Sequence, residues 1–94
     1  MKPAALEFES RDRRALPDKP LRLAWLDERG HIRSLTGRCI DVSRRRIHVE
    51  VPEHIPLDTR IMLRADGLNV AGSASVKYVT RCDRTFILVL DVRD

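Results

Sequence analysis

Short stretches in which hydrophobic and polar residues alternate follow one another over most of the chain. The clearest stretch covers residues 46–51, in which Ile47, Val49 and Val51 occupy every second position. A period of two places these three side chains on one face of an extended strand. Residues 85–92 are almost continuously apolar and predict a further strand.

Four more strands are predicted between turn signals. Residues 21–25 alternate and precede the polar turn Asp27-Glu28-Arg29-Gly30. Asp66-Gly67 fits a tight hairpin turn, and the small residues at 71–75 suit a sharp bend in a closing sheet. The other three strands are expected from residue 31 or 32 to 42, from 59 to 64 and from 68 to 79.

Six short strands without a convincing helix predict an all-β fold. We expect a six-stranded antiparallel β-barrel, because closing the sheet removes the two unpaired edges of an open sheet. Leu, Ile and Val must form most of the core, since the chain has only four aromatic residues. Cys39 and Cys82 are expected to be small buried residues. The predicted inward-facing residues include Leu23, Ile47, Val49, Val51, Leu63, Val76, Phe86, Leu88 and Leu90.

Residues 1–20 differ from the rest of the chain. They contain three of the five prolines and no sustained periodicity, and Pro17 and Pro20 disfavour a long regular element. We therefore divide the chain into a flexible arginine-rich N-terminal arm, residues 1–20, and a β-barrel, residues 21–94. Residues 1 to about 10 are predicted to be disordered, because they have few apolar groups to offset the entropy lost on ordering.

The chain is basic, with 18 Lys and Arg against 14 Asp and Glu and a formal net charge of +4. Only three of these 18 residues are lysines. Arginine binds phosphate, carboxylate and guanine edges through paired hydrogen bonds, so the composition favours an anionic partner. We expect a cytoplasmic protein without membrane insertion, because no apolar run is long enough to cross a bilayer and no hydrophobic segment follows Met1-Lys2.

Two groups of polar residues can contact an anionic ligand. The first is a cluster of arginines on the arm, which either closes over an anion or stays solvated as an ordinary charged tail. The second lies between the strands at 32–42 and 46–51, where Asp and Ser can also simply shape the turn and the arginines can be solvated. The candidate ligand-binding residues are Arg11, Arg13, Arg14, Asp41, Ser43 and Arg46.

The order of these features resembles the PilZ domain family from about Ser10 to Asp91. An arginine-rich arm is followed by an Asp-x-Ser-x-x-x turn, an Ile-x-Val-x-Val strand and a closing hairpin that contains V-x-Y-V-T-R and F-I-L-V-L-D. The resemblance implies a six-stranded barrel that binds the bacterial second messenger cyclic di-GMP and signals to other proteins. It also implies that arm arginines contact guanine edges and phosphates, while the Asp-x-Ser motif holds the ligand against the barrel.

The ligand motifs differ from the family pattern at two places. The family has R-x-x-x-R on the arm, but here Ser10 stands at the first arginine position when Arg14 is aligned with the second. Asp41 and Ser43 match the second motif, [DN]-x-S-x-x-G, whereas Arg46 replaces its glycine. We expect Arg46 to adopt ordinary strand geometry rather than positive φ. Its side chain either obstructs the guanine or swings aside and adds a phosphate contact. We favour obstruction and therefore expect weak binding of cyclic di-GMP or none.

Two other functions remain open. The same fold can act as a protein-interaction adaptor that binds an unidentified downstream partner without a ligand. A basic barrel can also bind single-stranded nucleic acid, but such barrels usually expose several stacking aromatics, and this chain has four in all. No enzyme activity is expected, because Asp41, Ser43 and His48 lack a nucleophile elbow. No metal site is expected either, because the histidines and cysteines lack the spacing of metal ligands.

Overall fold

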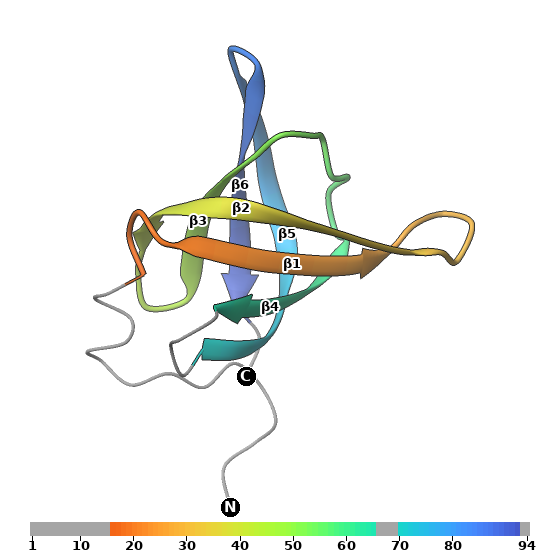
Figure 1. The fold of residues 1–94 in the computed structure, drawn as a ribbon, viewed down its shortest axis with the longest axis horizontal. Helices are drawn as coiled ribbons and strands as arrows, with labels where there is room; N and C mark the ends of the chain where they lie inside the picture. The colour runs from red at the N-terminus through yellow and green to blue at the C-terminus, as the bar shows by residue number, and fades with distance from the viewer. Residues whose placement is uncertain (1–15, 66–69, 93–94) are drawn as a thin grey trace, which may run out of the picture.

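The structure is a computed structural model that describes residues 16–65 and 70–92. These residues form strands β1 (Pro20–Leu26), β2 (Ile32–Val42), β3 (Arg46–Val51), β4 (Arg60–Ala65), β5 (Val70–Cys82) and β6 (Thr85–Val92). All neighbouring strands are antiparallel, and they lie side by side in the order β1-β2-β3-β6-β5-β4 (Figure 1). Because β4 also pairs with β1, the sheet closes into a barrel. The predicted all-β, six-stranded antiparallel barrel is therefore confirmed.

Aliphatic side chains fill the interior of the barrel. Eight of the nine predicted inward residues are buried, and Phe86 is partly buried against the same core. Phe86 pairs with Val51 near the start of β6, and its ring packs edge-on against His54 with 5.6 Å between the ring centroids. Burying a Val, Leu or Ile side chain contributes about 1.5–3 kcal/mol, so this single core is the main source of stability.

A β-bulge in β2 changes which side of the sheet its side chains face. Cys39 pairs with Val49 and is buried, but Asp41 pairs with His48, so Ile40 is an extra residue. Without this extra residue, alternation would place Asp41 on the same side as Cys39. The bulge therefore turns the Asp41 side chain to the outside, where it is exposed.

A second bulge, at Lys77 in β5, has the same effect. Val76 is buried in the core, whereas Tyr78, two residues later, is 51% exposed. After the bulge, the alternation of inward and outward side chains along β5 is reversed. The strand continues to Cys82, whose side chain therefore points into solvent. The prediction of two buried cysteines is thus confirmed for Cys39 and wrong for Cys82.

The described end of the N-terminal arm, residues 16–19, packs on the barrel. Leu16 is fully buried with the core residues. The Lys19 amide donates a hydrogen bond to the Leu16 carbonyl at 2.8 Å, which closes a turn where Asp18 has a φ of 68°. The predicted disorder of residues 1 to about 10 and the predicted Asp66-Gly67 turn lie outside the described residues.

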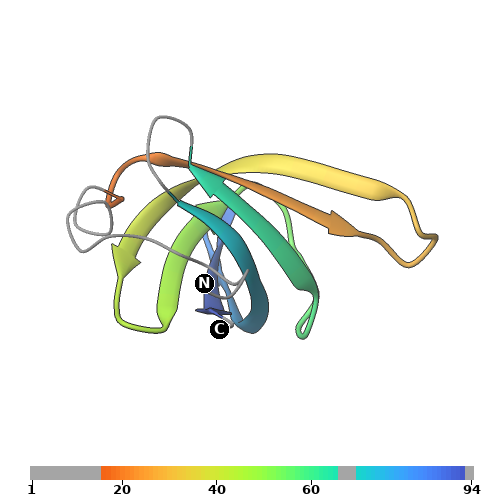
Figure 2. The same cartoon turned by 90° about the horizontal axis from the view of Figure 1, so that it is seen from below.

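The β1–β2 hairpin projects beyond the rest of the barrel in both views (Figures 1 and 2). Asp27 holds its turn, because Oδ1 accepts hydrogen bonds from the Arg29 and His31 amides, both at 2.9 Å. Gly30 in the same turn has a φ of 79°, a conformation that glycine adopts without strain. The outward side chains near this turn therefore stand away from most of the sheet.

Candidate functional site

Ser43 lies in the turn between β2 and β3, with Asp41 near the end of β2 and Arg46 at the start of β3. The Ser43 amide donates to the Arg46 carbonyl at 2.8 Å, and the Ser43 hydroxyl donates to the same oxygen at 3.4 Å. The Val92 amide of β6 donates to the Arg45 carbonyl at 2.7 Å, which ties the turn to the last strand. These hydrogen bonds fix the turn, so Ser43 shapes the backbone between Asp41 and Arg46.

A row of outward side chains crosses four strands beside this turn. Asp41 of β2 pairs with His48 of β3. His48 in turn pairs with Val89 of β6, and Val89 pairs with Tyr78 of β5. We call these four residues the outer row. Its two end residues are exposed and its two central residues are half-buried. The row offers a carboxylate, an imidazole, an apolar side chain and a phenol, groups that can hydrogen-bond and stack against a flat polar ring.

Arg46 lies on the same outer face as the outer row. It is the first residue of β3, where it pairs with Asp91 of β6. Its guanidinium carbon lies 5.8 Å from the centre of the Tyr78 ring, which is a cation–π contact. Arg46 is not one of the described residues that have a positive φ. The prediction that it adopts ordinary strand geometry is therefore confirmed. The guanidinium therefore covers one end of the outer row.

The arm joins the barrel at the residue before the β2 bulge. The Asp18 amide donates to the Cys39 carbonyl at 2.7 Å, and the Cys39 amide donates to the Lys19 carbonyl at 3.0 Å. Cys39 precedes Asp41 by only two residues, so the end of the arm and the outward carboxylate lie close together along β2. Three of the predicted ligand-binding residues lie outside the described residues: Arg11, Arg13 and Arg14.

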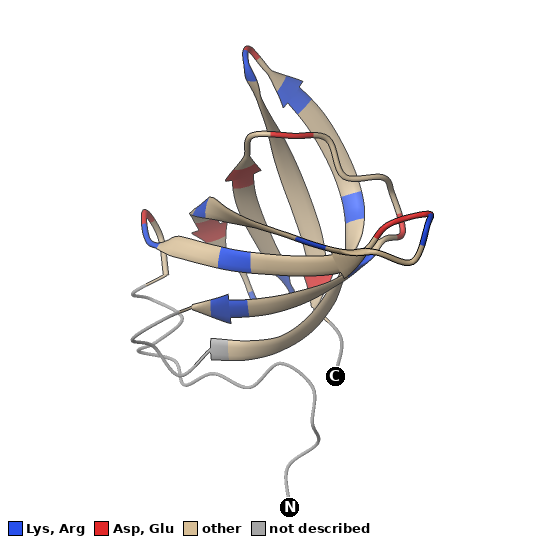
Figure 3. Cartoon of the chain, turned by 45° about the vertical axis from the view of Figure 1, so that its right-hand side comes forward, with Lys and Arg blue, Asp and Glu red and all other residues tan. Residues whose placement is uncertain are grey.

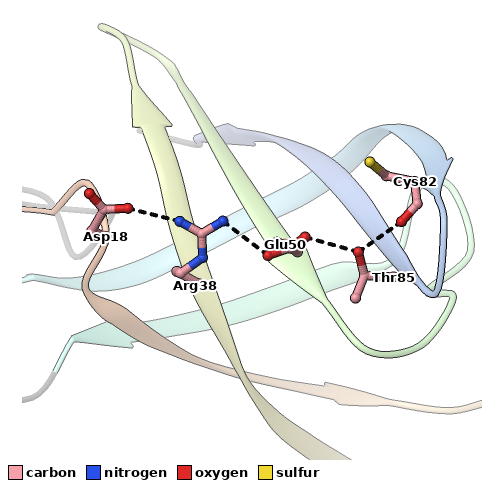
Figure 4. A network of polar contacts seen from close by, with 5 residues as sticks. All are labelled: Asp18, Arg38, Glu50, Cys82 and Thr85. Carbon is pink, nitrogen blue, oxygen red and sulfur yellow. Dashed lines mark hydrogen bonds and ion pairs between the residues drawn. The ribbon is translucent and has the colours of Figure 1, made fainter.

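A chain of polar contacts links the arm to β3 and to the β5–β6 turn (Figure 4). Arg38 donates through Nη1 to Asp18 Oδ1 at 2.8 Å and through Nη2 to Glu50 Oε1 at 3.1 Å. The Thr85 hydroxyl lies 2.9 Å from Glu50 Oε2 and 3.1 Å from the Cys82 carbonyl oxygen, and its single hydrogen serves one of them at a time. Arg38 thus bridges the end of the arm and β3.

These contacts stabilise the charged forms of both partners. The hydrogen bond from Thr85, followed by that from Arg38, lowers the pKa of Glu50. The hydrogen bond to Glu50 and its negative charge raise the pKa of Arg38. Sequence analysis did not single out Arg38, Glu50 or Asp18, because their contacts depend on how distant strands pair. Once β2 is placed against β3, the direct pairing of Arg38 with Glu50 is the signal that identifies these two residues.

The remaining reactive side chains do not form a second site. Burial raises the pKa of the Cys39 thiol to about 11, so this cysteine is protonated and unreactive near neutral pH. Within residues 16–65 and 70–92, no group of three or more His, Cys, Asp and Glu is arranged to hold a metal ion. The same residues contain no helix that is long and apolar enough to span a membrane.

Comparison with known proteins gave no match. No protein-family model matches the chain, and neither a curated protein nor a solved structure matches it. The function is therefore inferred from the residues of the outer face and from the resemblance of its motifs.

Proposed function

We propose that the face around the outer row binds cyclic di-GMP and that the domain is a receptor module without catalytic activity. One observation carries this proposal. The end of the arm hydrogen-bonds to β2 at Cys39, and the bulge that follows turns Asp41 outward, so the end of the arm and the outward carboxylate lie at neighbouring positions of β2. A ligand bound there would change how the arm packs on the barrel, and a downstream protein would bind the altered surface.

The chemical groups of this ligand match the side chains near the outer row. Cyclic di-GMP carries two phosphate charges and two guanines. Asp41 can accept hydrogen bonds from the N1–H and N2–H groups of guanine, which an arginine cannot do. Arg14, which precedes Leu16 by two residues in the sequence, can donate paired hydrogen bonds to a phosphate or to guanine O6 and N7.

Arg46 is expected to weaken this binding in the native chain. Its guanidinium lies over the Tyr78 ring, so a ligand on the outer row has to displace it. An exposed cation–π contact contributes about 0.5–1 kcal/mol, and the bulk of the side chain adds a steric cost. We expect the native domain to bind weakly or not at all, and Arg46→Gly to tighten binding at least about tenfold, or ~1.4 kcal/mol.

Calorimetric titration of the full chain with cyclic di-GMP, and separately with a short oligonucleotide, tests the proposal. In the Arg46→Gly background, Asp41→Ala and Arg14→Ala should each weaken binding by roughly 1.5–3 kcal/mol, the range for a hydrogen bond to a charged group. Arg11→Ala should weaken it less. Arg46→Ala removes the side chain without adding glycine's backbone freedom, so equal tightening by both substitutions assigns the effect to obstruction.

Matched controls come from the β1–β2 turn, at the other end of β2. Glu28→Ala and Arg29→Ala remove the same charges as the Asp41 and Arg14 substitutions and should leave binding unchanged. Equal losses in all variants, together with steep salt dependence, would indicate non-specific phosphate attraction and contradict the proposal. If Arg46→Gly weakens binding, Arg46 is a ligand-binding residue and the obstruction argument is wrong.

A ligand-independent interaction adaptor is the second candidate function. The observation in its favour is Arg46, which replaces the motif glycine and already contacts Tyr78. In that case neither the native chain nor Arg46→Gly responds to cyclic di-GMP. Nucleic-acid binding has less support, because Tyr78 is exposed whereas Trp25 is buried and Phe86 is partly buried. These described residues do not offer several exposed rings for stacking.

A further inference from the structure

The three histidines of the chain lie in different surroundings. His31 in the β1–β2 turn has its Nδ1 atom 3.9 Å from Asp27 Oδ2, and the His54 ring packs against Phe86. His48 is one of the two central residues of the outer row and is half-buried. Within the part of the chain that the structure describes, no hydrogen bond or ion pair involves its ring. Both of its ring nitrogens are therefore available to a molecule that covers the outer row.

The charges next to His48 decide what its protonation does. Both basic and acidic positions occur on the strands of the barrel (Figure 3). Asp41 of β2 lies directly opposite His48 on one side, and Val89 of β6 lies opposite on the other. Glu50, two residues along β3, is already bound by Arg38. The charged and titratable groups around His48 on the outer face are Arg38 and Asp41 on β2, Arg46 and Glu50 on β3, Tyr78 on β5 and Asp91 on β6.

We propose that protonated His48 contacts a phosphate of cyclic di-GMP, so that the outer face binds this ligand more tightly as the pH falls through the neutral range. This inference rests on the proposed function, and it adds a contact residue that the ligand motifs do not contain. The ligand carries two phosphate charges, and a negative charge beside an imidazole favours its protonated form. By linkage, protonation of the imidazole favours the ligand by the same factor.

Asp41 does not prevent this contact. A carboxylate has two oxygens and accepts several hydrogen bonds at once, so Asp41 can accept from a guanine and from the imidazolium together. Both ring nitrogens of a protonated histidine are donors, so one can serve Asp41 and the other a phosphate. A neutral histidine has only one donor. Loss of the proton thus removes a donor and a positive charge from the outer row.

Calorimetric titration with cyclic di-GMP at pH values of about 6, 7 and 8 tests the proposal, because histidine changes charge within this range. The full native chain and its Arg46→Gly variant are both measured. In the chain that binds more tightly, the affinity at the lowest pH should be at least about fivefold the affinity at the highest pH. His48→Gln in that chain keeps a hydrogen-bonding side chain that does not titrate, so it should abolish the pH dependence.

Two further variants separate the charge of His48 from other effects of pH. His48→Lys carries a positive charge over the whole range, so its affinity should change little with pH. The matched control is His31→Gln, which changes an exposed histidine at the other end of β2 and should leave the pH dependence unchanged. Thermal unfolding at each pH verifies that all the chains are folded.

Three results would overturn this inference and leave the proposed function intact. They are equal affinity at the lowest and highest pH, weaker binding at the lowest pH, and an unchanged pH dependence in His48→Gln. If neither the native chain nor Arg46→Gly binds cyclic di-GMP at any pH, the proposed function is itself wrong, and the inference about His48 is wrong with it.

Discussion

Gly37 offers a direct test of the β2–β3 register on which the outer row depends. A Cβ built on this buried glycine would lie 2.7 Å from the Glu50 carbonyl oxygen, 2.7 Å from Val49 Cγ2 and 2.9 Å from Val51 Cγ1. Real Cβ atoms essentially never approach other atoms below 3.0 Å, and one of these three contacts is with backbone. Gly37→Ala must therefore displace β3 or force the two valines to repack.

The expected loss of stability follows from overpacking. Adding a methyl group to a packed core costs typically about 1–3 kcal/mol. Replacing glycine by alanine also restricts the unfolded chain, which offsets roughly 0.4–1 kcal/mol of that cost. The difference spans about 0–2.6 kcal/mol. The 2.7 Å contact with the Glu50 carbonyl oxygen, a backbone atom, excludes the low end, so we expect the free energy of unfolding to fall by about 1–2 kcal/mol. In a domain of this size, that loss corresponds to a fall in Tm of roughly 4–16 °C.

Urea unfolding followed by Trp25 fluorescence measures this change. Ser34→Ala is the matched control, because Ser34 lies on the outer side of the same strand and is exposed. Its free energy of unfolding should stay within about 0.5 kcal/mol of the native value. If Gly37→Ala is as stable as the native chain, β3 does not lie against Gly37. The pairing of Asp41 with His48, and with it the outer row, would then be wrong.

Three further predictions concern the arm and two titrating groups. Leu16→Ala should lower the free energy of unfolding by about 2–5 kcal/mol, since Leu16 is fully buried, and an unchanged urea midpoint would show that the arm does not enter the core. The pKa of the Cys39 thiol is about 11 in the folded state, against an ordinary value of 9.0. The protonated thiol therefore contributes its full stabilisation at a pH below 9.0, and this stabilisation is lost as the pH rises from 9.0 toward 11. Cys39→Ala should therefore lose less stability than the native chain over this alkaline range, as measured by urea unfolding. If the two chains have identical pH profiles, the raised pKa of Cys39 is wrong. The pKa of Glu50 is lowered in the folded state, so its contribution is present above the ordinary Glu pKa and is lost as the pH falls through the folded value. Arg38→Met should make the acid dependence of the urea midpoint shallower, although the Thr85 hydrogen bond remains, and an unchanged slope would count against the Arg38–Glu50 contact.

The bounds of most strands could be predicted from the sequence. The bounds of β3 and β6 agree with the prediction, and those of β1, β2 and β4 agree within one residue at each end. The prediction ended β5 at residue 79, but the strand continues to Cys82. The bulge at Lys77 changes the phase of its alternation, so the sequence from Tyr78 onward no longer shows the pattern of a continuing strand.

The candidate site could be predicted only where it is local in sequence. Asp41, Ser43 and Arg46 lie close together in the sequence, and their residue types together with the resemblance of their motif singled them out. Arg38 and Glu50 stand 12 residues apart, and their contact requires β2 and β3 to pair in a particular register. Local patterns carry little information on register, because it is set by the packing of the whole barrel.

The two bulges explain why one face of the barrel carries polar groups that regular alternation would bury. Asp41 and Tyr78 are the two ends of the outer row, and each follows an extra residue in its strand. In a regular strand both would point into the core with Cys39 and Val76. A carboxylate buried there without a partner would be strongly unfavourable, so the Asp41 position is compatible with the fold only because of the bulge. Bulges often occur next to functional sites, where they redirect a side chain. The same two irregularities that interrupt the sequence pattern therefore also place the chemistry of the outer row on the surface.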